Sequence, residues 1–149
     1  MSSYAQIYLH IVFSTKNREP LIDSSWVARL YTMFGGVLRT VKCTLIAAGG
    51  VEDHVHLLVS MARDVSPSVA LRNIKTDSSK WIHDTFSELS SFHWQDGYAA
   101  FSVSHSQIDK VRAYIANQKE HHRKESFQDE LRGLLRLHGI EFDERYLWN

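Results

Sequence analysis

Residues 41–60, VKCTLIAAGGVEDHVHLLVS, contain two β-rich runs separated by a short polar segment. Two such runs so close together in sequence predict a β-hairpin. The first run carries Gly49 and Gly50, which we expect to mark a bulge or a bend. The hairpin is the centre from which the remaining elements of the fold are assigned.

The hydrophobic pattern on both sides of the hairpin predicts further strands and helices. Residues 4–14 alternate between apolar and polar side chains, which is typical of a strand with one buried face. Residues 24–40 and 66–86 have helical spacing, with Asp23 or Ser24 as N-cap of the first helix and Ser66 as N-cap of the second. Residues 98–104 form a fourth β-rich run. The order βαββαβ predicts an α+β, ferredoxin-like fold with an antiparallel sheet.

Two more helices are predicted after the sixth element. The first covers about 106–123, and the second runs from Phe127 to Leu137 and ends at Gly139 within a C-terminal segment of about 126–149. They need a surface on which to pack, either the uncovered sheet face or a second subunit. No linker divides the chain, so residues 1–149 are expected to form a single domain.

Composition excludes several classes of protein. Lys plus Arg and Asp plus Glu both number 17, so any nucleic-acid binding must use a local patch rather than net charge. The single Cys43 cannot form an internal disulfide, and the first residues do not resemble a signal peptide. No apolar run approaches the roughly 20 residues that cross a bilayer. We therefore expect a cytoplasmic protein without a membrane partner.

His54 and His56 are the first candidates for a functional site. Alternate residues of a strand share a face, so both imidazoles point away from the apolar side of this strand, with Cβ atoms about 7 Å apart. Two such imidazoles suit one divalent metal ion, and Asp53 can orient one of them. Structural histidines that hydrogen-bond their neighbours, with Asp53 as a turn residue, are the alternative interpretation.

A metal site needs further ligands, which the 106–123 helix offers. Tyr114 and Gln118 are four residues apart and therefore lie on one helical face. If this helix covers the open sheet face, Gln118 can complete the metal site, with Tyr114 one turn away. His121 and His122 are rival ligands, and their alternative role is a favourable charge at a helix C-terminus.

Three motifs in order carry a family resemblance: DHVHLLV, WQDGYAAFSVS and VRAYIANQKEHH. Together they closely resemble the single-tyrosine transposases of the HUH endonuclease superfamily, the TnpA type of small bacterial insertion sequences. They are also similar to the REP-associated tyrosine transposases. The resemblance extends over nearly the whole chain, from IYLHIVFSTKNREP to GIEFDERYLW.

The resemblance implies a metal-dependent DNA transposase. His54, His56 and Gln118 would hold Mg²⁺ or Mn²⁺, and Tyr114 would be the nucleophile that forms a 5′-phosphotyrosine link and releases a 3′-OH. The substrate would be single-stranded DNA with a hairpin near the element's end. The family also implies a homodimer in which the histidines of one subunit work with the tyrosine of the other, in a nucleoid-associated protein of a bacterium or archaeon.

Candidate DNA contacts are less specific, because most long cationic side chains on helices simply face water. Unpaired bases can stack on aromatic rings such as those of Tyr8, Trp94 and Tyr98, although the last two also suit structural roles. The cationic candidates are Lys16, Arg18, Arg72, Lys75, Lys80, Lys110, Arg112, Lys119 and Arg123.

Two other functions compete with the transposase. A non-catalytic dimer of the same fold would bind DNA or RNA hairpins without cutting them. A nucleotide hydrolase of the histidine-triad kind would need a third alternating histidine, where this chain has Leu58. The C-terminal aromatics Phe142, Tyr146 and Trp148 are expected to pack the tail against the domain.

Overall fold

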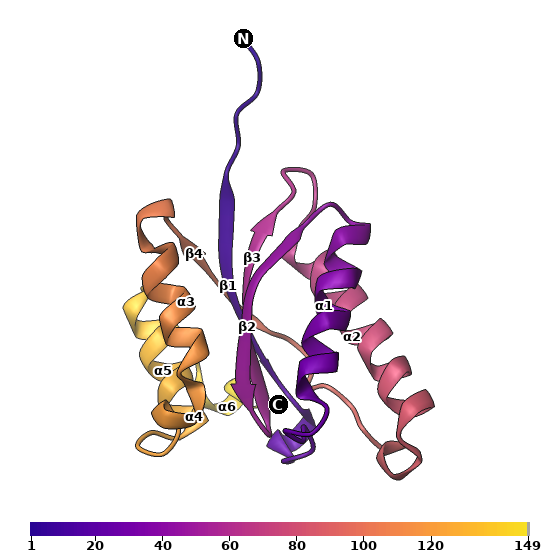
Figure 1. Ribbon diagram of the computed structural model, residues 1–149. Helices are drawn as coiled ribbons and strands as arrows, with labels where there is room; N and C mark the ends of the chain where they lie inside the picture. Colours follow the sequence, from indigo (N-terminus) through magenta and orange to yellow (C-terminus); the bar gives the residue numbers. More distant parts are fainter. Residues whose placement is uncertain (149) are drawn as a thin grey trace.

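The computed structural model describes residues 1–148, which form one antiparallel sheet with helices on both faces (Figure 1). The sheet order is β2-β3-β1-β4, and every pairing is antiparallel. This order confirms the ferredoxin-like α+β fold. The strands and main helices are β1 (Ile7–Ser14), α1 (Val27–Thr40), β2 (Thr44–Val51), β3 (His54–Met61), α2 (Pro67–Thr85), β4 (Ala99–Val103), α3 (Ile108–Ala116), α4 (Gln118–His121), α5 (Phe127–Leu137) and α6 (Glu144–Leu147). Short 3-10 turns lie at Lys16–Arg18, Ser87–Leu89 and His105–Gln107.

One face of the sheet packs against α1 and α2 and contains the main hydrophobic core. The inward side chains of β3 on this face are Val55, Leu57 and Val59, and all three are fully buried. From β1, Ile11 and Phe13 join them. The alternation of β1 and β3 therefore assigns their apolar sets to this layer, as the sequence predicts.

The opposite face of the sheet is covered by α3, α4 and α5, which lie together on the other side in Figure 1. A second, smaller core forms there from Val12, Phe101, Phe127, Leu131 and Leu135. The C-terminal helices thus cover the face that the first two helices leave open, within a single chain. Since His54 and His56 point to this face, they are enclosed rather than exposed.

The helix ends follow local sequence signals. Ser66 Oγ accepts a hydrogen bond from the Val69 N–H at 3.2 Å, and Pro67 occupies the first helical position of α2. Gly139, with φ of 67°, follows the last turn of α5, where the Ile140 N–H bonds the Leu135 carbonyl. Among residues 1–148, no helix combines the length and the apolar character needed to span a membrane.

Two predicted helices differ from the observed ones. The first begins at Val27 instead of Ser24, because Asp23 accepts the Ser25 N–H in a turn before the helix. The predicted 106–123 helix begins at Ile108 and is interrupted at Asn117, which has φ of −100° and ψ of 22°. The apolar stripe ends at Ile115 and residues 117–123 are all polar, so hydrophobic spacing cannot detect the break.

Of the bulge or bend predicted at Gly49 and Gly50, the bulge is wrong. Both residues pair regularly with β3, opposite His56 and Val55, and the irregularity lies between Leu45 and Ala47. Gly49 instead permits a close approach of α3, because a Cβ atom built on it would lie 2.2 Å from the Ile115 carbonyl oxygen. Because Gly49 has no side chain, α3, which carries Tyr114, can pack closely against β2 and the neighbouring β3, which carries His56.

We predict that Gly49→Ala destabilises the protein by about 1–3 kcal/mol, because α3 must move away from β2. Gly133→Ala on α5 is the matched control, since a Cβ atom there has no neighbour within 4 Å. The control should raise stability by about 0.5–1 kcal/mol through helix propensity. Urea unfolding monitored by circular dichroism measures both changes, and equal effects at the two sites would contradict the close-approach explanation.

Candidate active site

Three histidines from neighbouring strands form the floor of the candidate site. His54 and His56 on β3 are fully buried, and His10 on β1 is 4% exposed. His10 Nε2 lies 2.8 Å from His56 Nδ1, which leaves His56 Nε2 directed toward the helices above. The carboxylate of Asp53 lies 2.7 Å from His54 Nδ1, and so it orients that imidazole in the same way.

Tyr114 and Gln118 lie above this floor. The Tyr114 ring meets the His56 ring edge to face, with centroids 5.8 Å apart. Gln118 is buried, and its Oε1 lies 3.4 Å from His54 Nε2. Its Nε2 donates to the Tyr114 carbonyl at 3.4 Å, across the interruption at Asn117. The structure therefore brings together within one chain all four residues expected to carry the chemistry.

Glu130 of α5 lies at the centre of the site and is only 3% exposed. Its Oε1 is 3.0 Å from His56 Nε2, 3.0 Å from His122 Nε2 and 3.4 Å from His54 Nε2. Its Oε2 accepts a hydrogen bond from the Tyr114 hydroxyl and another from Gln118 Nε2 at 3.2 Å. One carboxylate thus contacts both the imidazole cluster and the tyrosine.

The sequence analysis missed Glu130 and His10 and treated His122 only as a rival ligand. A signal for Glu130 exists in the sequence, because it occupies position i+3 from Phe127 and lies beside Leu131 on the apolar stripe of its helix. A carboxylate on a stripe that faces a core needs a buried partner. His121 also approaches Glu130, with its Nε2 3.2 Å from Oε2.

The charge of Glu130 dominates the electrostatics of the cluster. Burial alone would raise its pKa, but hydrogen bonds from His54 and His56 hold the pKa of this carboxyl well below its usual range. Burial works against the charged form of His54 as well, yet Asp53 and Glu130 together raise the pKa of His54 above its ordinary value. For His56 burial prevails, and its pKa is lowered.

The phenol of Tyr114 is held in its protonated form. Burial and the hydrogen bond to Glu130 both raise the pKa of Tyr114 well above its usual range, because a phenolate would face the buried carboxylate. A phenol held protonated in this way is a weaker nucleophile than a phenolate.

The donor set fits a divalent metal ion. One ligand atom from each of His54, His56, His122 and Glu130 lies within 4.8 Å of all the others. Imidazole nitrogens and a carboxylate oxygen are common ligands of first-row divalent metals. In the described part of the chain, every buried side-chain nitrogen and oxygen has a hydrogen-bond partner, so hydrogen bonds fix the positions of these ligand atoms.

The cationic candidates for DNA contact fall on two sides of the sheet. Arg72, Lys75 and Lys80 belong to α2, across the sheet from the histidine cluster. The Lys75 ammonium donates to the carbonyls of Gln95 and Gly97, and Lys80 pairs with Asp84. Lys110, Arg112, Lys119 and Arg123 lie on or next to α3 and α4, the layer of Tyr114, whereas Lys16 and Arg18 lie in the 3-10 turn after β1.

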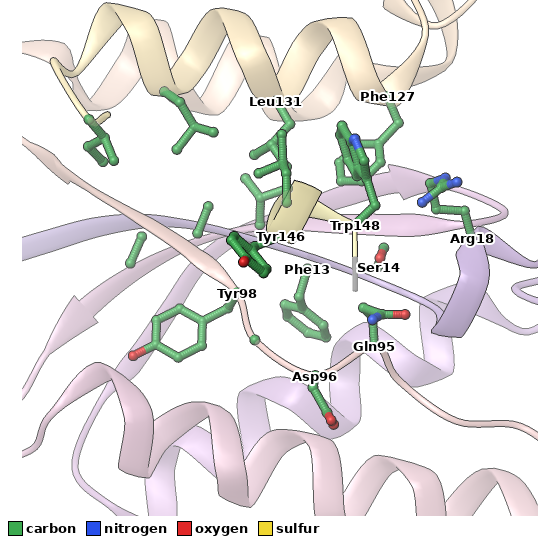
Figure 2. Close-up of a pocket in the computed structure, with 17 residues that line it drawn as sticks. Phe13, Ser14, Arg18, Gln95, Asp96, Tyr98, Phe127, Leu131, Tyr146 and Trp148 are labelled. Carbon is green, nitrogen blue, oxygen red and sulfur yellow. The ribbon is translucent and has the colours of Figure 1, made fainter. Parts of the chain in front are cut away.

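An apolar pocket of about 550 Å³ lies beside the cluster, between α5, β4 and the C-terminal tail (Figure 2). Phe127 joins the two sites, because it lines the pocket and stacks on His54 with ring centroids 4.2 Å apart. Trp148 lines the pocket as well, with the Arg18 guanidinium 5.3 Å from its ring centroid. Tyr98 lines it and is 41% exposed, whereas Trp94 is buried and donates to Ser78.

The tail packs partly as expected. Phe142 and Trp148 contact the smaller core, but Tyr146 remains 69% exposed at the pocket.

Comparison with known proteins now gives the family. The model of the family described as "Transposase IS200 like" matches residues 3–118, a region that contains β1 to α3 and the histidine pair His54 and His56. The chain therefore belongs to the IS200-like transposase family. No curated protein matches it.

Two solved structures share the fold. A protein from Deinococcus radiodurans R1, described as a candidate transposase, is 20% identical to this chain and has a similar fold with a TM-score of 0.65. The match covers 79% of this chain and 95% of that protein. A REP-associated tyrosine transposase bound to a REP hairpin is 18% identical to this chain, with a TM-score of 0.57. The match covers 77% of this chain and 70% of that protein. Both confirm the α+β architecture of an antiparallel sheet with packed helices.

We predict that the metal-free protein loses stability as the pH falls from about 6.5 toward 3. Burial of the imidazole and the neighbouring His56 lower the pKa of His10 to about 3 in the folded protein. In the unfolded chain the same imidazole takes up a proton near pH 6.5. The unfolded state therefore binds more protons in this window. The groups that face His10 are His56 on β3, Tyr114 on α3, Glu130 on α5 and His138 directly after α5.

The test measures the unfolding free energy in urea with chelator present, at pH 7 and pH 5. Stability should fall less between these pH values for His10→Gln than for the unmodified protein. An equal fall in both proteins would contradict a neutral, buried His10.

Proposed function

We propose that this IS200-like transposase cleaves and rejoins single-stranded DNA through a covalent bond to Tyr114. The observation that carries the proposal is the contact between the Tyr114 ring and the imidazole cluster of His54 and His56 inside one folded chain. The solved REP-associated transposase is bound to a REP hairpin, which supports a DNA hairpin as the substrate here. A cytoplasmic location, with access to the nucleoid, follows from such a substrate.

The proposed reaction is an in-line displacement at phosphorus. The Tyr114 oxygen forms a bond to phosphorus while the bond to the 3′ oxygen breaks, which gives a 5′-phosphotyrosine and a free 3′-OH. The phenol loses one proton and the released 3′ oxygen gains one, so the cleavage step is balanced. It needs no nucleoside triphosphate. The bond energy is retained in the tyrosine ester, and a second DNA end can therefore reverse the step.

The residues around Tyr114 have distinct proposed roles. His54, His56 and Gln118 would hold Mg²⁺ or Mn²⁺, with Asp53 orienting His54. The bound ion would neutralise the phosphodiester charge and polarise a nonbridging oxygen. Arg112 and Lys119 are proposed phosphate contacts because they lie on α3 and α4 with Tyr114, and Lys16 and Arg18 because they lie in the turn after β1. Arg72, Lys75 and Lys80 contribute less in this arrangement, since α2 lies across the sheet.

A covalent adduct is the direct test. With labelled single-stranded hairpin DNA and Mg²⁺ or Mn²⁺, we expect a protein–DNA adduct on a denaturing gel. Tyr114→Phe, His56→Ala and chelator should each abolish it. Tyr31→Phe is the matched control, because this half-buried phenol lies on α1 in the other layer, and its adduct yield should stay unchanged.

Each contrary outcome has a definite meaning for the adduct test. An adduct that persists in Tyr114→Phe would show that another group is the nucleophile. Hairpin binding without any adduct, unaffected by metal, would replace the transposase by the alternative function of a non-catalytic hairpin-binding protein. Equal cleavage of double-stranded DNA would contradict the substrate class.

The subunit arrangement is open to a separate test. We expected a homodimer that exchanges the tyrosine helix, but a site assembled within one chain does not require exchange. Mixing Tyr114→Phe with His56→Ala protein should therefore give no adduct, since each chain lacks one essential group. Adduct formation in the mixture, with neither variant active alone, would demonstrate a shared site between subunits.

A further inference from the structure

The two oxygens of Glu130 have different neighbours. Oε1 lies 3.0–3.4 Å from the Nε2 atoms of His54, His56 and His122. Oε2 faces the Tyr114 hydroxyl, the Gln118 amide and His121. The carboxylate therefore separates a metal-binding side from a nucleophile side, and α5 carries it beside the smaller apolar core.

The distances on the Oε1 side match those within a coordination sphere. Ligand atoms about 2.1 Å from one metal ion lie roughly 3.0–3.5 Å apart in tetrahedral or octahedral arrangements. The Nε2 atoms of His54, His56 and His122 all converge on one carboxylate oxygen at such spacings. A divalent cation can take the place of the protons that hold these atoms together, because metal binding releases protons from its ligands.

We propose that Glu130 and His122 bind the metal together with His54 and His56, and that Glu130 also positions the Tyr114 hydroxyl. Resting on the proposed function, this inference makes α5 part of the active site. Its carboxylate links the ion that holds the phosphate to the oxygen that attacks it, so the two are kept in register.

The chemical composition of the set determines the preferred ion. Three imidazoles and one carboxylate favour a first-row ion such as Mn²⁺ over Mg²⁺, which prefers oxygen ligands and retains its waters. Gln118 Oε1, 3.1 Å from His122 Nε2, adds one oxygen ligand to these four. Mn²⁺ is accordingly the probe of choice.

A purely structural ion pair is the competing explanation for Glu130. In that case Glu130 would only neutralise buried imidazoles and anchor α5, and its loss would lower stability without a specific effect on metal affinity. Glu130→Gln keeps the size of the side chain and one acceptor oxygen but removes the charge and replaces the second oxygen by an NH2 donor. Glu120→Gln on α4 makes the same charge change at an exposed position of the same layer.

The experiment measures Mn²⁺ binding to the metal-free, full-length protein by calorimetry, with circular dichroism to confirm folding. We expect Glu130→Gln and His122→Asn each to weaken Mn²⁺ binding by at least about tenfold, and Glu120→Gln to change it less than twofold. Mg²⁺ should bind the unmodified protein more weakly than Mn²⁺. Electron spin-echo spectra of bound Mn²⁺ should show three coordinated imidazoles, and two in His122→Asn.

The positioning role has its own measurement. At saturating Mn²⁺ and hairpin DNA, Glu130→Gln should reduce the single-turnover rate of adduct formation at least tenfold while hairpin affinity stays within twofold. Unchanged Mn²⁺ affinity in a folded Glu130→Gln variant, with His56→Ala still abolishing binding, would overturn the inference and leave the proposed function intact. Absence of any adduct from the unmodified protein would instead contradict the proposed function.

If Glu130→Gln fails to fold, His122→Asn decides the matter. His122 is at the edge of the cluster with a partly exposed side chain, so its loss is tolerated more easily than that of Glu130. Three imidazoles in the spectrum of the folded His122→Asn variant, or unchanged Mn²⁺ affinity, would refute the proposed ligand set.

Discussion

A single buried charge, the carboxylate of Glu130, constrains the second layer of this molecule. An ionised carboxylate can remain buried only if donors surround it. Imidazoles from β3 and from the segment after α4, the phenol of α3 and the amide of Gln118 together provide them. Because these donors come from elements far apart in sequence, satisfying one charge fixes α3, α4 and α5 relative to the sheet.

Strand alternation explains why the site lies between two layers. The period of two sends Val55, Leu57 and Val59 to the large core and His54 and His56 to the opposite face. A helix must approach closely for a tyrosine to reach these imidazoles, and the bare backbone of Gly49 permits this approach. The site is therefore assembled from three simple sequence features: an alternating strand, a glycine and an amphipathic helix.

The sequence predicts the fold well and the site only in part. Local signals such as the Ser66 cap, the Gly139 stop and the alternation in β1 and β3 identify elements, because each depends on neighbours within a few residues. The break at Asn117 escapes detection because it lies beyond Ile115, where the apolar stripe of this helix has already ended. The glycines were misread for a related reason: a close approach by Ile115, distant in sequence, leaves no local trace. Spacing and resemblance identify Tyr114 and Gln118, whereas they do not identify Glu130, whose partners lie on elements distant from it in sequence.

The position of Glu130 nevertheless breaks the amphipathic pattern of its own helix, and this break has a general value. Phe127, Leu131 and Leu135 define a stripe that faces the sheet, and a carboxylate among them is costly unless the facing surface is basic. On the other side of the interface, two imidazoles on a strand are costly to bury unless an acid or a metal faces them. Each anomaly predicts the chemistry of the other. An acidic residue on one apolar stripe and a histidine pair on one strand face are therefore evidence for the docking of that helix on that face, independent of any resemblance to known proteins.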